Sequence, residues 1–204
     1  MVCDLVLGTV LRPHVQAVAF FAAAIAFLPT GSVCAQAQTV AHYNAVELKR
    51  ESATTVQFAF ALNLPQVLHV LLAPQLAYPA FLQTYADMPD PVFEKEVTKA
   101  GALLSAKAFF TLPNGAKAPV KQWQWPPQQA MRDLFKASLL LLSLPPGAAS
   151  HLDPVPVLAK AQAKTGISRA QLQLPPALYP VIVSLPNEKF WLTDQIPMAL
   201  VELP

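Results

Sequence analysis

Residues 54–62, TTVQFAFAL, alternate between large apolar side chains and smaller or polar ones, and this pattern decides the fold class. Val56, Phe58 and Phe60 recur at every second position, which is the period of a strand with one buried face. A stretch of similar character, residues 40–48, precedes it across a charged corner. The two stretches therefore predict a β-hairpin.

A second hairpin is predicted in the middle of the chain, with strands at 108–112 and 118–125. The turn between them contains Asn114 and Gly115, which both tolerate the positive φ angles that a tight turn needs. The C-terminal part also favours strands, because short alternating or β-branched stretches are separated there by prolines. We expect these strands at 169–174, 180–185, 189–193 and 196–203.

Two longer helices are predicted between these strands. The first begins at Asp90-Pro91, since Asp90 can cap the free N–H groups of the first turn and proline suits the first helical position. The second begins after Pro127 and continues to about Ser143. Short helices bounded by prolines are expected within 64–88, and a further short helix at 155–164.

Together these elements predict an α+β fold. A mainly antiparallel sheet would be built from N-terminal and C-terminal strands, with the two longer helices over one face and several short Pro-bounded helices beside them. The 21 prolines among 204 residues favour such short elements over long helical bundles.

The N-terminus has the order of features of a secretory signal peptide. Arg12 precedes an apolar run at 15–28, and helix-breaking residues then lead to the A-x-A motif of Ala35 and Ala37. The apolar run is shorter than the about 20 residues that cross a bilayer. We therefore predict a cleavable signal peptide at 1–37, with Ala35 and Ala37 as its cleavage motif.

Cleavage would leave one soluble α+β domain, residues 38–204, without cysteine, because Cys3 and Cys34 both lie in the predicted signal peptide. No later stretch is apolar and long enough to be a transmembrane helix. We expect the domain in the periplasm. The alternatives are an extracellular protein, or a membrane-tethered one if the signal stays uncleaved.

Charge is sparse in this chain: charged residues make up 13% of it, whereas hydrophobic residues make up 54%. The net charge is +2, and the charges are interspersed along the sequence without a basic stripe or an acidic block. Nucleic-acid binding needs a concentrated positive surface to neutralise phosphates, so this balance argues against a nucleic-acid partner.

Two candidate ligand or partner surfaces combine aromatic and polar residues. Lys121, Trp123 and Trp125 would share one side of a strand, where the indoles could stack on a sugar ring, receive a partner's apolar side chain or pack under the helices. Phe190 and Trp191 would lie at a hairpin tip, where a structural role is again the alternative.

The histidines of the predicted domain, His42, His69 and His151, match no zinc-ligand spacing. His151 and Asp153 could form a general base oriented by a carboxylate, but the chain has no G-x-S-x-G nucleophile motif. We therefore predict no catalytic residue, no metal site and no cofactor.

These patterns predict an exported, non-catalytic interaction module that binds another protein of the cell envelope, because apolar and aromatic residues exceed what one small core readily buries. The first alternative is a domain that binds a small ligand or a glycan through the strand that carries Trp123 and Trp125. A hydrolase built around His151 and Asp153 is the second. The sequence leaves the oligomeric state open.

Overall fold

The computed structural model describes residues 43–145 and 152–204, which form nine strands, four α-helices and one short 3₁₀-helix. The strands are β1 (Asn44–Arg50), β2 (Thr55–Leu62), β3 (Phe109–Thr111), β4 (Lys117–Gln124), β5 (Val155–Gln162), β6 (Arg169–Gln173), β7 (Val181–Leu185), β8 (Glu188–Leu192) and β9 (Met198–Glu202). The helices are α1 (Leu64–Leu72), α2 (Tyr78–Ala86), α3 (Asp90–Lys107), α4 (Gln128–Leu142) and the 3₁₀-helix η1 (Pro176–Leu178). The predicted signal peptide, with Ala35 and Ala37, and the histidines His42 and His151 lie outside the described residues.

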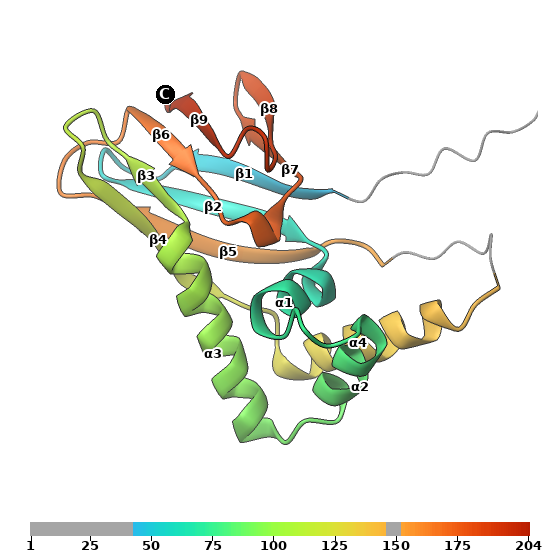
Figure 1. The fold of residues 1–204 in the computed structure, drawn as a ribbon. Helices are drawn as coiled ribbons and strands as arrows, with labels where there is room; N and C mark the ends of the chain where they lie inside the picture. Colours follow the sequence, from blue (N-terminus) through green and yellow to red (C-terminus); the bar gives the residue numbers. More distant parts are fainter. Residues whose placement is uncertain (1–42, 146–151) are drawn as a thin grey trace, which may run out of the picture. The chain divides into compact units, whose positions relative to one another are not determined.

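The nine strands join one sheet in the order β8-β7-β1-β2-β5-β4-β3-β6-β9. The sheet is mixed, because β1 and β7 run parallel whereas the other neighbours run antiparallel. It curves into a nearly closed, barrel-like form (Figure 1). The α+β class is confirmed, but the prediction of a mainly antiparallel sheet from terminal strands is corrected. The sheet is mixed because β1 pairs in parallel with the distant β7, and no local turn signal in the sequence predicts this pairing. The sheet is also not built from terminal strands alone, because β3 and β4 from the middle of the chain belong to it.

Large apolar side chains fill the inside of the curved sheet. Val56, Phe58 and Phe60 are buried on β2, which confirms the alternation that predicted this strand. The ring centroids of Phe58 and Phe110 lie 5.4 Å apart, although β5 and β4 separate their strands in the sheet. The two rings can meet because the sheet curves around a common core.

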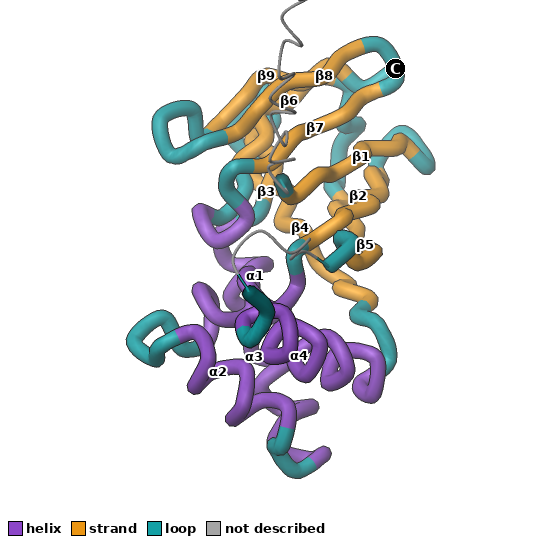
Figure 2. Tube along the Cα trace, turned by 90° about the vertical axis from the view of Figure 1, so that its right-hand side faces the viewer, coloured by secondary structure: helices purple, strands orange, loops and turns teal. Residues whose placement is uncertain are grey.

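The four α-helices of the described chain gather at one end of the sheet (Figures 1 and 2). The two longer helices, α3 and α4, and the two short Pro-bounded helices, α1 and α2, occur where the sequence predicts them. The ring centroid of Phe135 lies 5.8 Å from that of Phe81 and 6.0 Å from that of Phe93. The helices therefore pack on one another at one end of the sheet, whereas the sequence predicted that they cover one of its faces.

The start of α3 is held by an ion pair instead of the predicted cap. The N-cap residue is Pro89, and the cap makes no side-chain hydrogen bond. Arg132 Nη2 donates to Asp90 Oδ1 at 2.8 Å, and Arg132 Nη1 donates to the carbonyl oxygen of Ala86 at 3.2 Å. The guanidinium of Arg132 is buried and lies 4.8 Å from the ring centre of Phe93. Asp90 therefore joins α3 to α4, and its predicted capping role is wrong.

Most of the stretch 155–164, which the sequence predicts to be helical, forms strand β5 between β2 and β4. Its inward side chains, such as Val157 and Ala159, are buried. Pro156 is tolerated because it precedes Leu158, where the pairing of β5 with β4 ends. Pairing on both sides overrides the helix propensity of the alanines, lysine and glutamine in this stretch.

Candidate interaction site

A β-bulge in β4 separates the side chains that the sequence predicts on one side of this strand. Lys121 pairs with Lys160 of β5, and the register then shifts so that two residues of β4 oppose one of β5. Gln122, within the bulge, has a φ of 55°, which lies in the left-handed region. Lys121 therefore faces outwards, whereas Trp123 turns towards the interior, and the structure does not bring them onto one surface.

Trp123 is half-buried and is fixed by neighbours on β2 and α3. Its ring centroid lies 5.2 Å from that of Phe60 and 6.0 Å from that of Trp125, both in stacked arrangements. Its Nε1 donates to Ser105 Oγ at 2.9 Å. Gly101 of α3 lies against both indoles, where a Cβ atom would be 3.6 Å from Trp125 Nε1. Trp123 thus joins the barrel interior to α3, and Trp125 forms the outer end of the stack.

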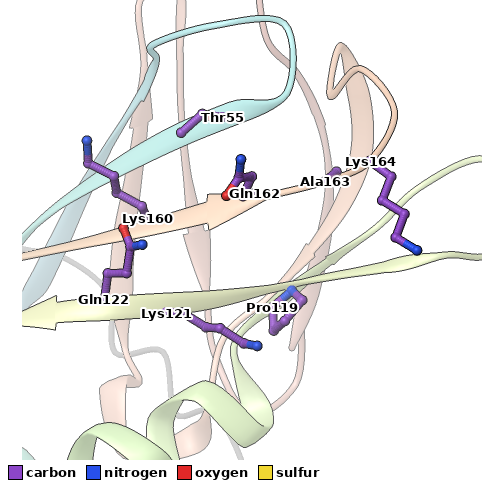
Figure 3. A pocket seen from close by; sticks show the side chains of 8 residues that line it. All are labelled: Thr55, Pro119, Lys121, Gln122, Lys160, Gln162, Ala163 and Lys164. Carbon is purple, nitrogen blue, oxygen red and sulfur yellow. The ribbon is translucent and has the colours of Figure 1, made fainter.

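The lysine groove is a hollow of about 470 Å³ on the outer face of β2, β5 and β4 (Figure 3). Its lining consists of Thr55, Pro119, Lys121, Gln122, Lys160, Gln162, Ala163 and Lys164. The polar groups of this lining are three ammonium groups, two amides and one hydroxyl, without a carboxylate, imidazole or thiol. Such a lining can bind an anion, but it offers no pair of groups for acid–base chemistry at neutral pH.

Two lysines of the lysine groove lie opposite one another in the sheet, although their side chains extend in different directions. Lys121 and Lys160 are direct partners in the β4–β5 ladder, and like charges at such positions are destabilising. Lys160 Nζ donates to Glu51 Oε2 at 2.7 Å, and Figure 3 shows its side chain extending away from those of Lys121 and Lys164. Within the described part of the chain, Lys121 and Lys164 form no ion pair. Both remain available to an anion from outside.

The sheet register extends the positive charge beyond the groove. Lys49 of β1 lies opposite Gln57 of β2, which in turn lies opposite Lys160. Sequence reasoning found Lys121 but missed Lys49, Lys160 and Lys164, because these residues are far apart along the chain and form no basic stripe there. The alternation in β2 could have predicted that Lys49 and Lys160 lie on either side of Gln57. That prediction also requires the assignment of β5 as a strand.

The second predicted aromatic surface lies elsewhere on the sheet. Trp191 of β8 is 41% exposed, and its ring meets that of Tyr43 edge-on with the centroids 4.5 Å apart. Phe190 is half-buried and packs against the core. Four strands separate β8 from β4 in the sheet order, so Phe190 and Trp191 form no common site with Lys121.

The remaining candidates from the sequence give no reactive cluster. His69 Nε2 lies 2.8 Å from the carbonyl oxygen of Leu76, and its ring packs against Tyr78 and Phe81. Asp153 is described, but the geometry of its predicted pairing with His151 lies outside the described residues. Among residues 43–145 and 152–204, no group of three or more His, Cys, Asp or Glu is placed to hold a metal ion.

Comparison of the chain with protein-family models, curated proteins and solved structures finds no match. None of the helices within the described residues combines the length and the apolar character needed to cross a bilayer. The chemistry of the lysine groove is therefore the basis for a functional proposal.

Proposed function

We propose that this chain is an exported, non-catalytic binding module of the cell envelope and that its lysine groove holds an acidic segment of another protein. The observation that carries the proposal is the direct opposition of Lys121 and Lys160 across β4 and β5. Like charges at these positions lower the stability of the sheet. An anionic group that binds at Lys121 and Lys164, which form no ion pair among the described residues, would offset this cost.

A backbone feature at the same place supports a binding role. Gln122 lines the groove and has a φ of 55°. A side-chain-bearing residue in this left-handed region costs about 1–2 kcal/mol relative to the right-handed one. Residues held in such conformations concentrate at binding sites, where the surrounding structure keeps them in place. Charge repulsion and backbone strain thus coincide in one groove.

The lining of the groove favours an acidic polypeptide as the anion. The groove crosses three strands (Figure 3), and the amides of Gln122 and Gln162 and the hydroxyl of Thr55 can bond a peptide backbone between the lysines. Nucleic acid is a poorer fit, because its affinity depends on many phosphate contacts and the groove offers only three ammonium groups.

The export part of the proposal rests on the N-terminal sequence. Residues 1–37 have the charge, apolar run and A-x-A motif of a cleavable signal. The intact mass of the protein from the extracytoplasmic fraction tests it: we expect a chain that begins at Gln38. A mass that retains residues 1–37 would contradict cleavage and leave a membrane-tethered protein.

Binding to labelled poly-L-glutamate, measured by fluorescence anisotropy on the chain from residue 38, tests the groove itself. We expect an affinity that falls as salt is added, because exposed charges are screened. The triple variant Lys121→Gln, Lys160→Gln and Lys164→Gln should bind at least tenfold more weakly than the wild type.

A matched triple variant distinguishes the effect of the groove lysines on the affinity from the effect of the net charge. Lys95→Gln, Lys107→Gln and Lys136→Gln remove the same charge from exposed positions on α3 and α4 and should change the affinity less than twofold. Equal losses in both triples would show that the overall charge drives binding. Tighter binding of single-stranded DNA than of poly-L-glutamate would point to nucleic acid in place of a protein partner.

A further inference from the structure

A second groove, here named the tryptophan groove, lies between α3, the β4–α4 connection and the start of α4. It has a volume of about 310 Å³ and shares no lining residue with the lysine groove. Phe93, Val97 and Met131 are buried and provide apolar lining, and the half-buried Trp125 lines the groove beside them. The groove thus combines an apolar base with one large aromatic ring.

Trp125 is held as the outer member of a three-ring stack. The stack begins at Phe60, which is buried in the barrel, and passes through Trp123 to Trp125. The hydrogen bond from Trp123 to Ser105 fixes the middle ring, and Gly101 of α3 lies beside both indoles. A ring held in this way has little conformational freedom to lose when a ligand binds. It is a preformed platform for another ring.

Two polar groups beside this platform, on Glu94 and Thr98, can accept hydrogen bonds. Glu94 is exposed and forms no ion pair among the described residues. Thr98 Oγ1 donates to the carbonyl oxygen of Glu94 at 2.9 Å, so the lone pairs of that hydroxyl oxygen remain free to accept. A matching ligand therefore has an apolar ring face for Trp125 and hydrogen-bond donors at its edge.

We infer that the tryptophan groove binds a single pyranose ring of a glycan. A pyranose presents C–H groups on its face and hydroxyl donors around its edge, which matches the indole and the two acceptors. The groove volume is at the lower end of the about 300–1,000 Å³ range of small-ligand sites, which suits one ring. The phenylalanine side chain of a peptide would match the stack but would bring no donor to the carboxylate of Glu94, and tyrosine or tryptophan would bring only one.

Saturation-transfer NMR on the chain from residue 38 tests the inference, with the methyl glycosides of glucose, N-acetylglucosamine and glucosamine as probes. We expect transfer to the ring C–H protons of at least one probe. Trp125→Phe and Glu94→Gln should each weaken its binding at least threefold. Trp191→Phe, at an exposed tryptophan on β8, is the matched control and should leave the affinity unchanged.

The absence of transfer to all three probes would overturn the inference, and so would binding that neither Trp125→Phe nor Glu94→Gln weakens. Glu94→Gln keeps the test valid if Trp125→Phe disturbs the stack, because Glu94 lies on the exposed side of α3. The triple lysine variant of the other groove should bind the sugar like the wild type. A negative result for poly-L-glutamate binding at the lysine groove would therefore not contradict sugar binding at the tryptophan groove.

Discussion

Lys121 and Lys160 lie directly opposite one another in the β4–β5 ladder, although each carries a positive charge. Glu51 compensates Lys160 through an ion pair of 2.7 Å, whereas Lys121 has no acidic partner within the described residues. The sheet therefore keeps an uncompensated cation at a position where a neutral side chain would be more stable. The stability of Lys121 variants can measure this cost.

We expect Lys121→Gln to raise the free energy of unfolding by about 0.2–1 kcal/mol, because it removes the like-charge pair with Lys160. Lys121→Glu should raise it further by forming a cross-strand ion pair. Urea denaturation at low salt measures both changes, which should shrink at high salt. Lys95→Gln on α3 is the control and should not raise the free energy of unfolding. A Lys121→Gln variant that is less stable than the wild type would refute the like-charge interpretation.

The left-handed conformation of Gln122 predicts how substitutions in the bulge change the free energy of unfolding. Gln122→Gly should be neutral or stabilising by up to about 1 kcal/mol, because glycine adopts this region freely but loses more entropy on folding. Gln122→Val should destabilise by about 1–2 kcal/mol, because a β-branched residue fits this region poorly. Chemical denaturation of both variants gives the comparison. Equal stabilities would mean that the bulge relaxes to a different conformation.

Local patterns in the sequence identified most elements of the fold. The alternation in β2 and the Asn114-Gly115 turn predicted two hairpins, and prolines at the starts of α3 and α4 marked the longer helices. The stretch that became β5 was misassigned, because its alanines and its lysine favour a helix and only its neighbours make it a strand. The parallel pairing of β1 with β7 was also missed, because residues distant in sequence create it.

The candidate sites were harder to predict than the elements. Lys121, Trp123 and Trp125 were singled out, but strict alternation placed them on one side of a strand, and no glycine marks the bulge at Gln122. The partner of Lys121, Lys160, depends on the register between β4 and β5. Residues that strand pairing brings together can be predicted as one site only when the strand order and the register are known.

Asn44 joins three segments of the fold, and its removal should destabilise the protein. Its Nδ2 donates to the carbonyl oxygen of Leu178 at 2.9 Å, and its Oδ1 accepts from the N–H of Asn63 at 2.9 Å. Asn44→Ala should cost about 1–3 kcal/mol for each group that stays buried without a partner. Thermal and urea denaturation measure the loss.

Asn44→Asp is the informative companion variant. It keeps an acceptor for the N–H of Asn63 but places an oxygen against the carbonyl oxygen of Leu178, so it should not restore the stability. A cost below about 0.5 kcal/mol for Asn44→Ala would show that solvent replaces both bonds.

The ionisation of Tyr85 should make the fold sensitive to alkaline pH. Burial, together with the negative charge of Glu96, raises the pKa of Tyr85 to about 12 from its ordinary value of 10.0. The hydroxyl of Tyr85 lies 3.4 Å from Glu96 Oε2, its hydrogen-bond acceptor. Between these two pH values the folded chain keeps a proton that the unfolded chain has lost. The free energy of unfolding should therefore fall as the pH rises from 10 to 12.

Tyr85→Phe isolates this contribution, because phenylalanine fills the same space and cannot ionise. Burial also raises the pKa values of Tyr78 and Tyr179, so the variant should keep part of the alkaline loss but show a shallower decline than the wild type. Urea denaturation at a series of pH values between 9 and 12 gives the two slopes. Identical slopes would mean that Tyr85 titrates alike in the folded and unfolded chains, and the alkaline instability would then arise from other groups.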